Sequence, residues 1–349
     1  MTVGEETMRA IRLVEPGSPV VDATVERPRP GPGEVLVRVR AAGICHSDAH
    51  YRAGSSSSGP HPLIPGHEVA GTVAETGPGT AKPGEGERVC LHYLDTCGSC
   101  RACAAGEEQF CPEASMLGKS RDGGWAEYVC VPARNAVPIP EGVTFAHAAV
   151  MMCSTATSYH ALRRARLAAG ERVAVFGAGG LGLSAVQLAR ICGAMEIFAV
   201  DVRPGPLETA RELGATPVRA DEGDPAARIR EATGGDGADV AVEVAGRPET
   251  VRASLASLAP GGRVALAGIF PGAVEVEPYA EFICREAELV GVSDHQLSEI
   301  RDLLAWAERG ALRLDPVVRR TVSLEAEAVN AVLDRLEAFE AEGRTVIVP

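Results

Sequence analysis

The sequence predicts an α/β protein made of a β-rich part and a doubly wound parallel sheet. Three observations support this prediction. Residues 8–145 contain short strand-like runs separated by glycine and proline turns. From about residue 151 onwards, strand and helix patterns alternate, as they do in a parallel sheet covered by helices. The length of 349 residues also exceeds what one hydrophobic core usually supports.

Composition and charge define the broad class of protein. Apolar residues make up 46% and charged residues 23%, which is typical of a globular chain. The formal charge of −13 argues against nucleic acid or an anionic membrane as a partner. The acidic start resembles no signal peptide, and no apolar run reaches the roughly 18 residues of a membrane span. We therefore expect a cytoplasmic protein that acts on a small molecule, with residues 1–7 as a frayed extension.

The β-rich part predicts a small irregular barrel. Its clearest expected strands are residues 34–40, 68–76, 87–94 and 125–131. Prolines between these runs keep the connections out of helices. The serine-rich loop 54–59 is interpreted as a solvated tip without a function.

The alternating part predicts a parallel sheet, since each strand-like run is followed by a helical one. The expected strands are residues 171–176, 196–200, 239–244, 263–269 and 288–292. Residues 183–192 have helical spacing. Further on, residues 296–308 and 324–339 predict amphipathic helices, and residues 345–348 predict a last strand.

A glycine-rich turn at residues 177–182 lies between an expected strand and an expected helix. Glycines at such a turn let the backbone approach a pyrophosphate, whose charge meets the helix N-terminus. Asp201 ends the next expected strand, roughly 20 residues further on, where an acid would bind ribose hydroxyls and repel a 2′-phosphate. The turn therefore predicts a dinucleotide site that prefers NAD over NADP. Arg203 lies close enough to weaken that preference.

Ten cysteines without a secretion signal indicate thiols and metal ligands rather than disulfides. Four of them form one cluster with short spacings: Cys97, Cys100, Cys103 and Cys111. Four thiolates can surround a single zinc ion tetrahedrally and leave no open position. This cluster therefore predicts a structural zinc site. The isolated Cys90, Cys130, Cys192 and Cys284 lie in apolar stretches and are expected to be small core residues.

Two short segments supply the side chains of an open zinc site, one around Cys45 and one around His67. A thiol, an imidazole and the Ser47 hydroxyl lie within them, which is the combination used in metal-assisted hydride transfer. Isolated cysteines and histidines are more often core or surface residues, so these assignments depend on the pattern as a whole.

That pattern resembles the zinc-dependent medium-chain alcohol dehydrogenases. The motifs that carry the resemblance are residues 43–48, 65–71, 122–128, 177–182 and 343–344 together with the cysteine cluster. The resemblance implies a GroES-like barrel domain at residues 1–150 and 292–349, with a Rossmann NAD-binding domain at residues 151–291 inserted in it. The active site would lie in the cleft between the domains.

The resemblance also implies ligands for the catalytic zinc, namely Cys45, His67 and Cys153. Glu68 would lie behind the metal, and Asp48 would orient His67.

For catalysis and cofactor binding, the resemblance implies that Ser47 takes the substrate proton and His50 passes it to solvent. His46 and Arg344 would contact the pyrophosphate. Thr157 and Leu181 would flank the nicotinamide, next to Gly177, Gly179, Gly180 and Gly182 of the turn.

These features together indicate an NAD-dependent oxidoreductase with one catalytic and one structural Zn²⁺ per chain. It would act on primary or secondary alcohols and on aldehydes or ketones. The alternatives are a polyol or sugar dehydrogenase, a reductase of C=C bonds, and a non-catalytic NAD- and zinc-binding protein. Residues 262–292 resemble the segment through which relatives pair their sheets, so a homotetramer or a homodimer is expected.

Overall fold

The computed structural model describes residues 6–349, which form two units. The first unit comprises the chain up to Cys153 together with Gln296–Gly310 and Val318–Pro349. The second comprises Ser154–His295 and the short return Ala311–Val317. The second unit is thus inserted in the sequence of the first. The expected fold class, a Rossmann domain inserted in a barrel-like domain, is confirmed.

The first unit is built on a seven-stranded sheet with the order β16-β17-β3-β4-β5-β9, in which β8 also pairs with β3. The long strand β3 pairs antiparallel with β4, β8 and β17 and is therefore the centre of the sheet. Its side chains are buried over most of its length, and only between Val37 and Ala41 do buried apolar side chains alternate with the exposed Arg38 and Arg40. The strands are β3 (Glu34–Ile44), β4 (Glu68–Thr76), β5 (Arg88–Leu91), β8 (Tyr128–Pro132), β9 (Ala136–Pro138), β16 (Val318–Ser323) and β17 (Arg344–Val348).

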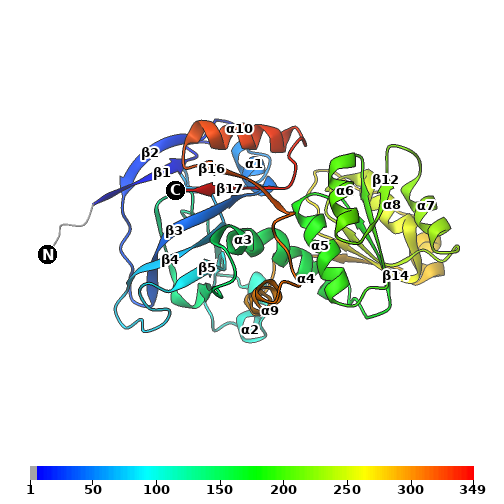
Figure 1. The fold of residues 1–349 in the computed structure, drawn as a ribbon, viewed down its shortest axis with the longest axis horizontal. Helices are drawn as coiled ribbons and strands as arrows, with labels where there is room; N and C mark the ends of the chain where they lie inside the picture. Colours follow the sequence, from blue (N-terminus) through cyan, green and yellow to red (C-terminus); the bar gives the residue numbers. More distant parts are fainter. Residues whose placement is uncertain (1–5) are drawn as a thin grey trace. The chain divides into compact units, whose positions relative to one another are not determined.

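Smaller elements complete the first unit (Figure 1). Two antiparallel pairs flank the sheet, β1 (Thr7–Arg12) with β2 (Val21–Glu26) and β6 (Leu94–Asp95) with β7 (Ser115–Met116). Helix α10 contacts α1, so the two helices lie side by side. The helices are α1 (His46–Ala53), α2 (Arg101–Ala104), α3 (Phe145–Val150), α9 (Leu297–Glu308) and α10 (Ala326–Glu337).

The second unit contains a six-stranded parallel sheet with the order β12-β11-β10-β13-β14-β15. This is the strand order of a doubly wound dinucleotide-binding sheet. From β10 the strands are added first on one side, as β11 and β12, and then on the other, as β13, β14 and β15. The strands are β10 (Arg172–Phe176), β11 (Glu196–Asp201), β12 (Thr216–Arg219), β13 (Ala238–Glu243), β14 (Leu258–Leu266) and β15 (Glu288–Gly291).

Helices cover both faces of this parallel sheet (Figure 1). Helix α5 contacts both α4 and α6, whereas α7 contacts α8. The apolar residues between the helices and the strands, such as Phe176, Val200 and Val264, are almost fully buried. The helices are α4 (Ala156–Arg164), α5 (Gly180–Ile191), α6 (Pro204–Glu212), α7 (Pro225–Ala232) and α8 (Pro248–Ser257).

Several elements differ from the sequence-based expectations. Strands β12 and β16 were not expected, since their side chains are largely exposed and polar. Thr7 pairs with Glu26 within β1 and β2, so it belongs to a strand and not to an extension; residues 1–5 lie outside the described residues. Cys284 is exposed and is not a core residue, because the turn that carries it lies at the surface of the second unit.

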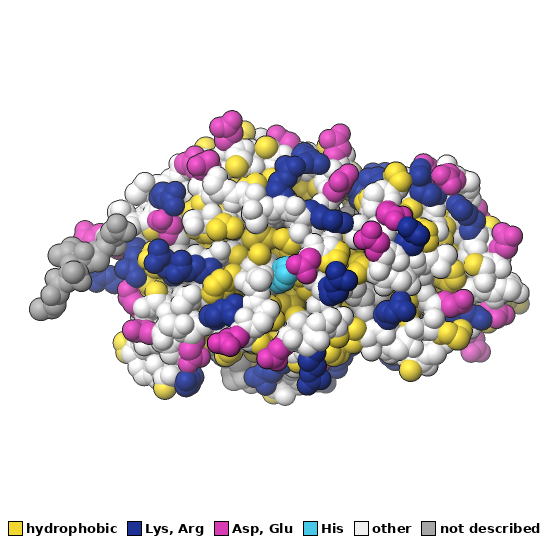
Figure 2. Space-filling view, viewed as in Figure 1, with side chains coloured by type: hydrophobic (Ala, Val, Ile, Leu, Met, Phe, Trp, Pro, Cys, Tyr) yellow, Lys and Arg dark blue, Asp and Glu magenta, His cyan; other side chains and the backbone are white. Residues whose placement is uncertain are grey.

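On the face shown in Figure 2, acidic and basic side chains are interspersed over both units. Within residues 6–349, every helix falls short of the length or the apolar character that a membrane crossing requires.

Candidate active site

Helix α1 begins where the central strand β3 ends, and this junction positions Cys45. The Asp48 carboxylate accepts a hydrogen bond of 2.8 Å from the Cys45 backbone N–H, which caps the first turn of the helix. Asp48 is buried, and its second oxygen lies 3.3 Å from Nδ1 of His67. Asp48 thus fixes Cys45 through its backbone and His67 through its ring.

His67 directly precedes strand β4, which begins at Glu68. The residue before it, Gly66, has φ +96°, and a Cβ there would lie 2.2 Å from the Trp125 ring. Only glycine fits this turn, because both the backbone conformation and the space exclude a side chain. Burial opposes protonation of His67, but Asp48 and Cys45 outweigh it and raise the pKa of the ring well above its usual range.

Cys153 comes from a separate segment, the π-helical turn Met151–Thr155. Such wide turns occur mostly at functional sites, and this one aims the thiol at Cys45. The two sulfurs lie 3.9 Å apart. The hydrogen bond between them lowers the pKa of Cys45 and raises that of Cys153.

Glu68 and Arg344 form an ion pair under these thiols. Both are buried, and the guanidinium donates to one carboxylate oxygen of Glu68. Burial raises the pKa of Glu68, and the positive charge of Arg344 opposes that shift. Because Arg344 begins β17 and Glu68 begins β4, the pair also joins two strands that flank β3.

The donor atoms of Cys45, His67, Glu68 and Cys153 all lie within 4.8 Å of one another. Among the described residues, the buried Nε2 of His67 and Oε2 of Glu68 have no hydrogen-bond partner. An unpartnered buried polar atom is costly unless something binds it, and two thiols with an imidazole suit zinc. The four residues therefore fit a zinc ion.

The expected proton-relay residues lie on α1 next to this group. Ser47 Oγ is 3.8 Å from Cys45 Sγ, whereas His50 Nδ1 is 3.1 Å from Ser55 Oγ. Ser55 belongs to the serine-rich loop that was interpreted as a solvated tip, and it is exposed. The His46 ring packs against Phe339, and burial lowers the pKa of His46.

In the second unit, the glycine-rich turn joins β10 to α5, as expected. A Cβ on Gly182 would lie 1.7 Å from the Gly177 carbonyl oxygen, so this glycine allows the turn to close on itself. A Cβ on Gly179 would meet nothing within 4 Å, so the space above it is open. These are the two conditions that a bound pyrophosphate requires. Gly180 is the first residue of α5.

Asp201 ends β11 beside this turn. One carboxylate oxygen accepts a hydrogen bond of 2.9 Å from the Ala178 N–H, and the other accepts from the Arg203 backbone and side chain. Arg203 therefore neutralises part of the charge that would repel a 2′-phosphate.

Helix α4, which carries Thr157, is tied to the same turn. The Ser158 hydroxyl donates a hydrogen bond of 2.8 Å to the Leu181 carbonyl, and Thr155 pairs with Ser184 at 3.2 Å. The neighbourhoods of Thr157 and Leu181 are thus fixed relative to each other.

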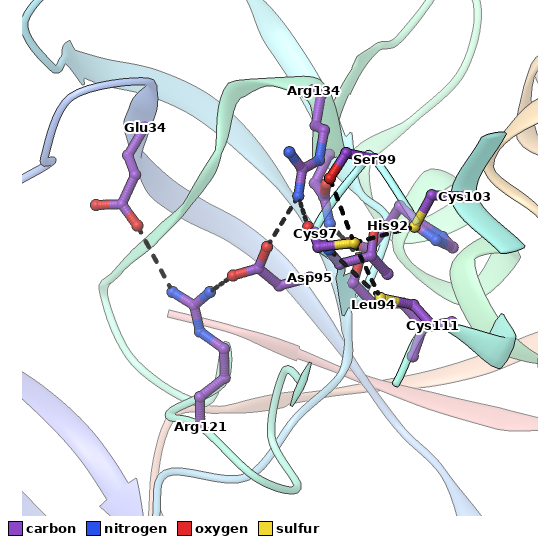
Figure 3. Close-up of polar contacts among 12 residues, drawn as sticks. Glu34, His92, Leu94, Asp95, Cys97, Ser99, Cys103, Cys111, Arg121 and Arg134 are labelled. Carbon is purple, nitrogen blue, oxygen red and sulfur yellow. Dashed lines mark hydrogen bonds and ion pairs between the residues drawn. The ribbon is translucent and has the colours of Figure 1, made fainter. Parts of the chain in front are cut away.

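The four clustered cysteines come together in residues 96–112, named here the cysteine lobe (Figure 3). Three pairs of their sulfurs are separated by 3.5–3.9 Å. Sulfurs around a tetrahedral zinc at about 2.3 Å would lie about 3.8 Å apart, whereas a disulfide needs about 2.05 Å. Backbone N–H groups of Ser99 and Cys100 lower the pKa of Cys97 to about 6. The cluster therefore fits a closed zinc site.

A parallel dinucleotide-binding sheet inserted in a barrel that carries a buried sulfur and nitrogen donor set defines a class, the two-domain zinc-containing dehydrogenases. The family model "Alcohol dehydrogenase GroES-like domain" matches residues 31–141. The model "Zinc-binding dehydrogenase" matches residues 180–309.

Individual relatives cover almost the whole chain. An NAD-dependent alcohol dehydrogenase of Sulfurisphaera tokodaii is 34% identical, over 98% of this chain and 100% of the relative. A solved NAD-dependent alcohol dehydrogenase is 31% identical with a TM-score of 0.92, over 98% of this chain and 100% of the other. A zinc-binding dehydrogenase of Sinorhizobium meliloti, solved with NADP, is 32% identical with a TM-score of 0.91, over 99% and 100%. The chain belongs to the zinc-dependent medium-chain alcohol dehydrogenase family, and it is an oxidoreductase of that family.

Proposed function

We propose that this protein transfers a hydride between NAD(H) and a small alcohol or its aldehyde or ketone, with zinc at the site formed by Cys45, His67 and Cys153. The observation that carries the proposal is the buried donor set itself. His67 Nε2 has no hydrogen-bond partner among the described residues, and two thiols lie beside it. A core histidine in a purely structural role would be paired.

The residues around the donor set give it a catalytic character. Zinc, when bound, supplies a positive charge that lowers the pKa of an alcohol and polarises a carbonyl group. Glu68 provides the fourth donor of the group, a carboxylate oxygen, and Arg344 balances its charge. The Asp48 carboxylate lies 3.3 Å from Nδ1 of His67, and its charge favours one orientation of the ring, which leaves Nε2 for the metal.

The proton path starts at Ser47, whose hydroxyl lies beside the donor set. Ser47 accepts the proton of the substrate alcohol, and His50 passes it to solvent. Because Ser55 engages Nδ1 of His50, the relay uses Nε2 of that ring. Without this path the proton would have to leave through a buried site.

The cofactor is held by the second unit. The nicotinamide ring of NAD accepts the hydride. The open space above Gly179 receives the pyrophosphate of NAD at the N-terminus of α5. Thr157 and Leu181 flank the nicotinamide. Asp201 binds the adenosine ribose and favours NAD, and Arg203 allows weak binding of NADP.

A second zinc occupies the cysteine lobe, with Cys97, Cys100, Cys103 and Cys111 as its ligands. The four sulfurs leave no open position, so this ion is structural. We propose two zinc ions per chain on this basis.

The quaternary structure that we propose is a homotetramer or a homodimer, paired through the edge strand β15. Apolar side chains are exposed on and near this strand, including Leu289, Tyr279 and Ile283. An exposed edge strand with apolar neighbours is a preferred site for pairing with a second copy. Light scattering measures the state directly, and a monomer would contradict this proposal.

The ten free cysteines favour a reducing compartment, the cytoplasm.

The experiment that tests the function combines turnover with metal content. NADH formation is followed over simple alcohols, diols, polyols and sugars, and zinc is determined on the same sample. We expect turnover and about two zinc ions per chain in the wild type. Cys153→Ala should lose about one zinc and the activity, whereas Cys90→Ala, a buried cysteine outside both clusters, should keep both. Zinc without turnover on any alcohol would redirect the proposal to C=C reduction or to a non-catalytic role.

A further inference from the structure

The cysteine lobe is not held by hydrophobic packing. Across residues 96–112 only Cys111 is buried, and the large apolar side chain of Phe110 is 57% exposed. A segment of this kind stays folded through its metal and through polar contacts with the barrel.

Asp95 provides one of these polar contacts just before the lobe begins. One of its carboxylate oxygens is 2.7 Å from Arg121 and the other is 3.3 Å from Arg134 (Figure 3). Arg121 in turn donates 3.0 Å to the Cys130 carbonyl of β8. The start of the lobe is thus fastened to the barrel by a carboxylate held between two guanidinium groups.

Arg134 reaches further into the lobe than Arg121 does. Its guanidinium also donates to the Thr96 carbonyl, and a Cβ on Gly98 would lie 3.3 Å from Nη1. Thr96 and Gly98 are the two neighbours of Cys97. Gly98 has φ +74°, so the chain turns sharply directly under the guanidinium. Arg134 therefore holds the backbone before the first cysteine by a hydrogen bond and lies close to the turn that follows it.

The backbone that Arg134 holds is the backbone that orients the sulfurs. The Cys100 N–H donates to Cys97 Sγ at 3.3 Å, and the Cys97 N–H donates to Cys111 Sγ at 3.4 Å. Both bonds require the turn at residues 97–100 to keep its conformation. If the turn loosened, Cys97 would lose its donors and one metal ligand would move.

Charge adds to this effect. Four thiolates around a divalent zinc carry a net negative charge, and the adjacent Glu107, Glu108 and Glu113 add more. Arg101 is the single basic residue inside the lobe. Arg134 brings a second positive charge from the barrel. Its side chain is 46% exposed, so its ion pair with Asp95 alone would contribute little.

We propose that Arg134 is a positioning residue for the structural metal. By fixing Thr96 and covering the turn at Gly98 it keeps Cys97 in the coordination sphere and slows the loss of zinc. The inference rests on the structural zinc site proposed above, and it assigns to a residue outside the cysteine motif a direct part in metal retention.

The test measures the release of zinc from the whole protein to a chromogenic chelator. Arg134→Met should release the structural zinc about tenfold faster than the wild type, because a charged hydrogen bond to the Thr96 carbonyl is lost. Arg101→Met is the matched control, since it removes a positive charge from the lobe without touching the Thr96 carbonyl. It should release zinc more slowly than Arg134→Met does, because only the contribution of charge is lost and the Thr96 contact stays in place. Cobalt substitution identifies the site, because a tetrathiolate and a mixed sulfur and nitrogen site absorb differently.

Arg134→Lys separates position from charge. Lysine keeps the charge but cannot contact Asp95 and Thr96 with a planar fork, so we expect release faster than in the wild type. Release at the wild-type rate from Arg134→Met or Arg134→Lys, or equally fast release from Arg101→Met, would overturn the inference. A wild-type protein without a second zinc would instead overturn the structural site itself.

Discussion

Two glycines of the same turn should respond oppositely to alanine. At Gly182 a Cβ would lie 1.7 Å from the Gly177 carbonyl oxygen and 2.8 Å from its carbon, which are backbone atoms of a buried turn. At Gly179 the Cβ would meet nothing within 4 Å, and the backbone there has φ −74°, which alanine adopts readily. The sequence motif treats both positions alike, but the structure does not.

The magnitudes follow from these distances. Overpacking against backbone costs about 3 kcal/mol, the upper part of the usual range, because no side chain can move away. In a unit of this size that corresponds to a melting temperature lower by about 6–12 °C for Gly182→Ala. Gly179→Ala should leave stability unchanged or raise it by about 0.5 kcal/mol. Its methyl group would stand where the pyrophosphate approaches, so the affinity for NAD should fall about tenfold or more.

Scanning calorimetry without cofactor and NADH titration by fluorescence separate the two effects. Gly182→Ala should have a lower melting temperature than the wild type. Gly179→Ala should melt like the wild type but bind NADH more weakly. If Gly182→Ala melted with the wild type, the close contact would not constrain the turn. If Gly179→Ala bound NADH normally, the open space would not be the pyrophosphate site.

Three further predictions concern the first unit. Arg344→Met leaves the buried Glu68 carboxylate uncompensated and should cost about 3–5 kcal/mol in urea unfolding; a loss below about 1 kcal/mol would refute the buried pair. Burial lowers the pKa of His92 to about 3, so the unfolded chain takes up a proton first as the pH falls below about 6.5. Stability should drop by about 2 kcal/mol by pH 5, and His92→Gln should flatten that slope. Arg52→Met breaks the contacts of 2.7 and 2.8 Å between α1 and α10 and should cost about 2 kcal/mol, against about 0.5 or less for Arg335→Met, whose side chain is only half-buried.

The elements that the sequence predicted well are those that local spacing determines. The turn at residues 177–182 and the four cysteines of the lobe each lie within a short stretch, so their geometry follows from the residues themselves. Strands β4 and β10 were expected almost at their observed bounds, and in β10 the reason is its continuous apolar run from Val173 to Phe176.

What the sequence could not predict depends on residues far apart in the chain. The π-helical turn that aims Cys153 has no local signal, since its residues favour an ordinary helix equally well. Ser55 resembles any loop serine until it meets His50. Arg52 has the sequence pattern of a surface residue, and only the fold shows that it is buried and paired with Asp334 and Glu337 of α10. Strand β16 is too polar to be recognised without its partner β17.

The place of β17 in the sheet has a consequence for biosynthesis. This strand, which ends at Val348, pairs on one side with β3, where Thr345 faces Ile44, and on the other side with β16. The second unit is almost continuous in sequence and can fold while the chain is still being made. The first unit must wait, because β3 lacks a neighbour and Glu68 lacks its cation until Arg344 has left the ribosome. A chain that stops before β17 therefore leaves the Ala42–Ile44 edge of β3 without this partner, although β4 and β8 can still pair with β3.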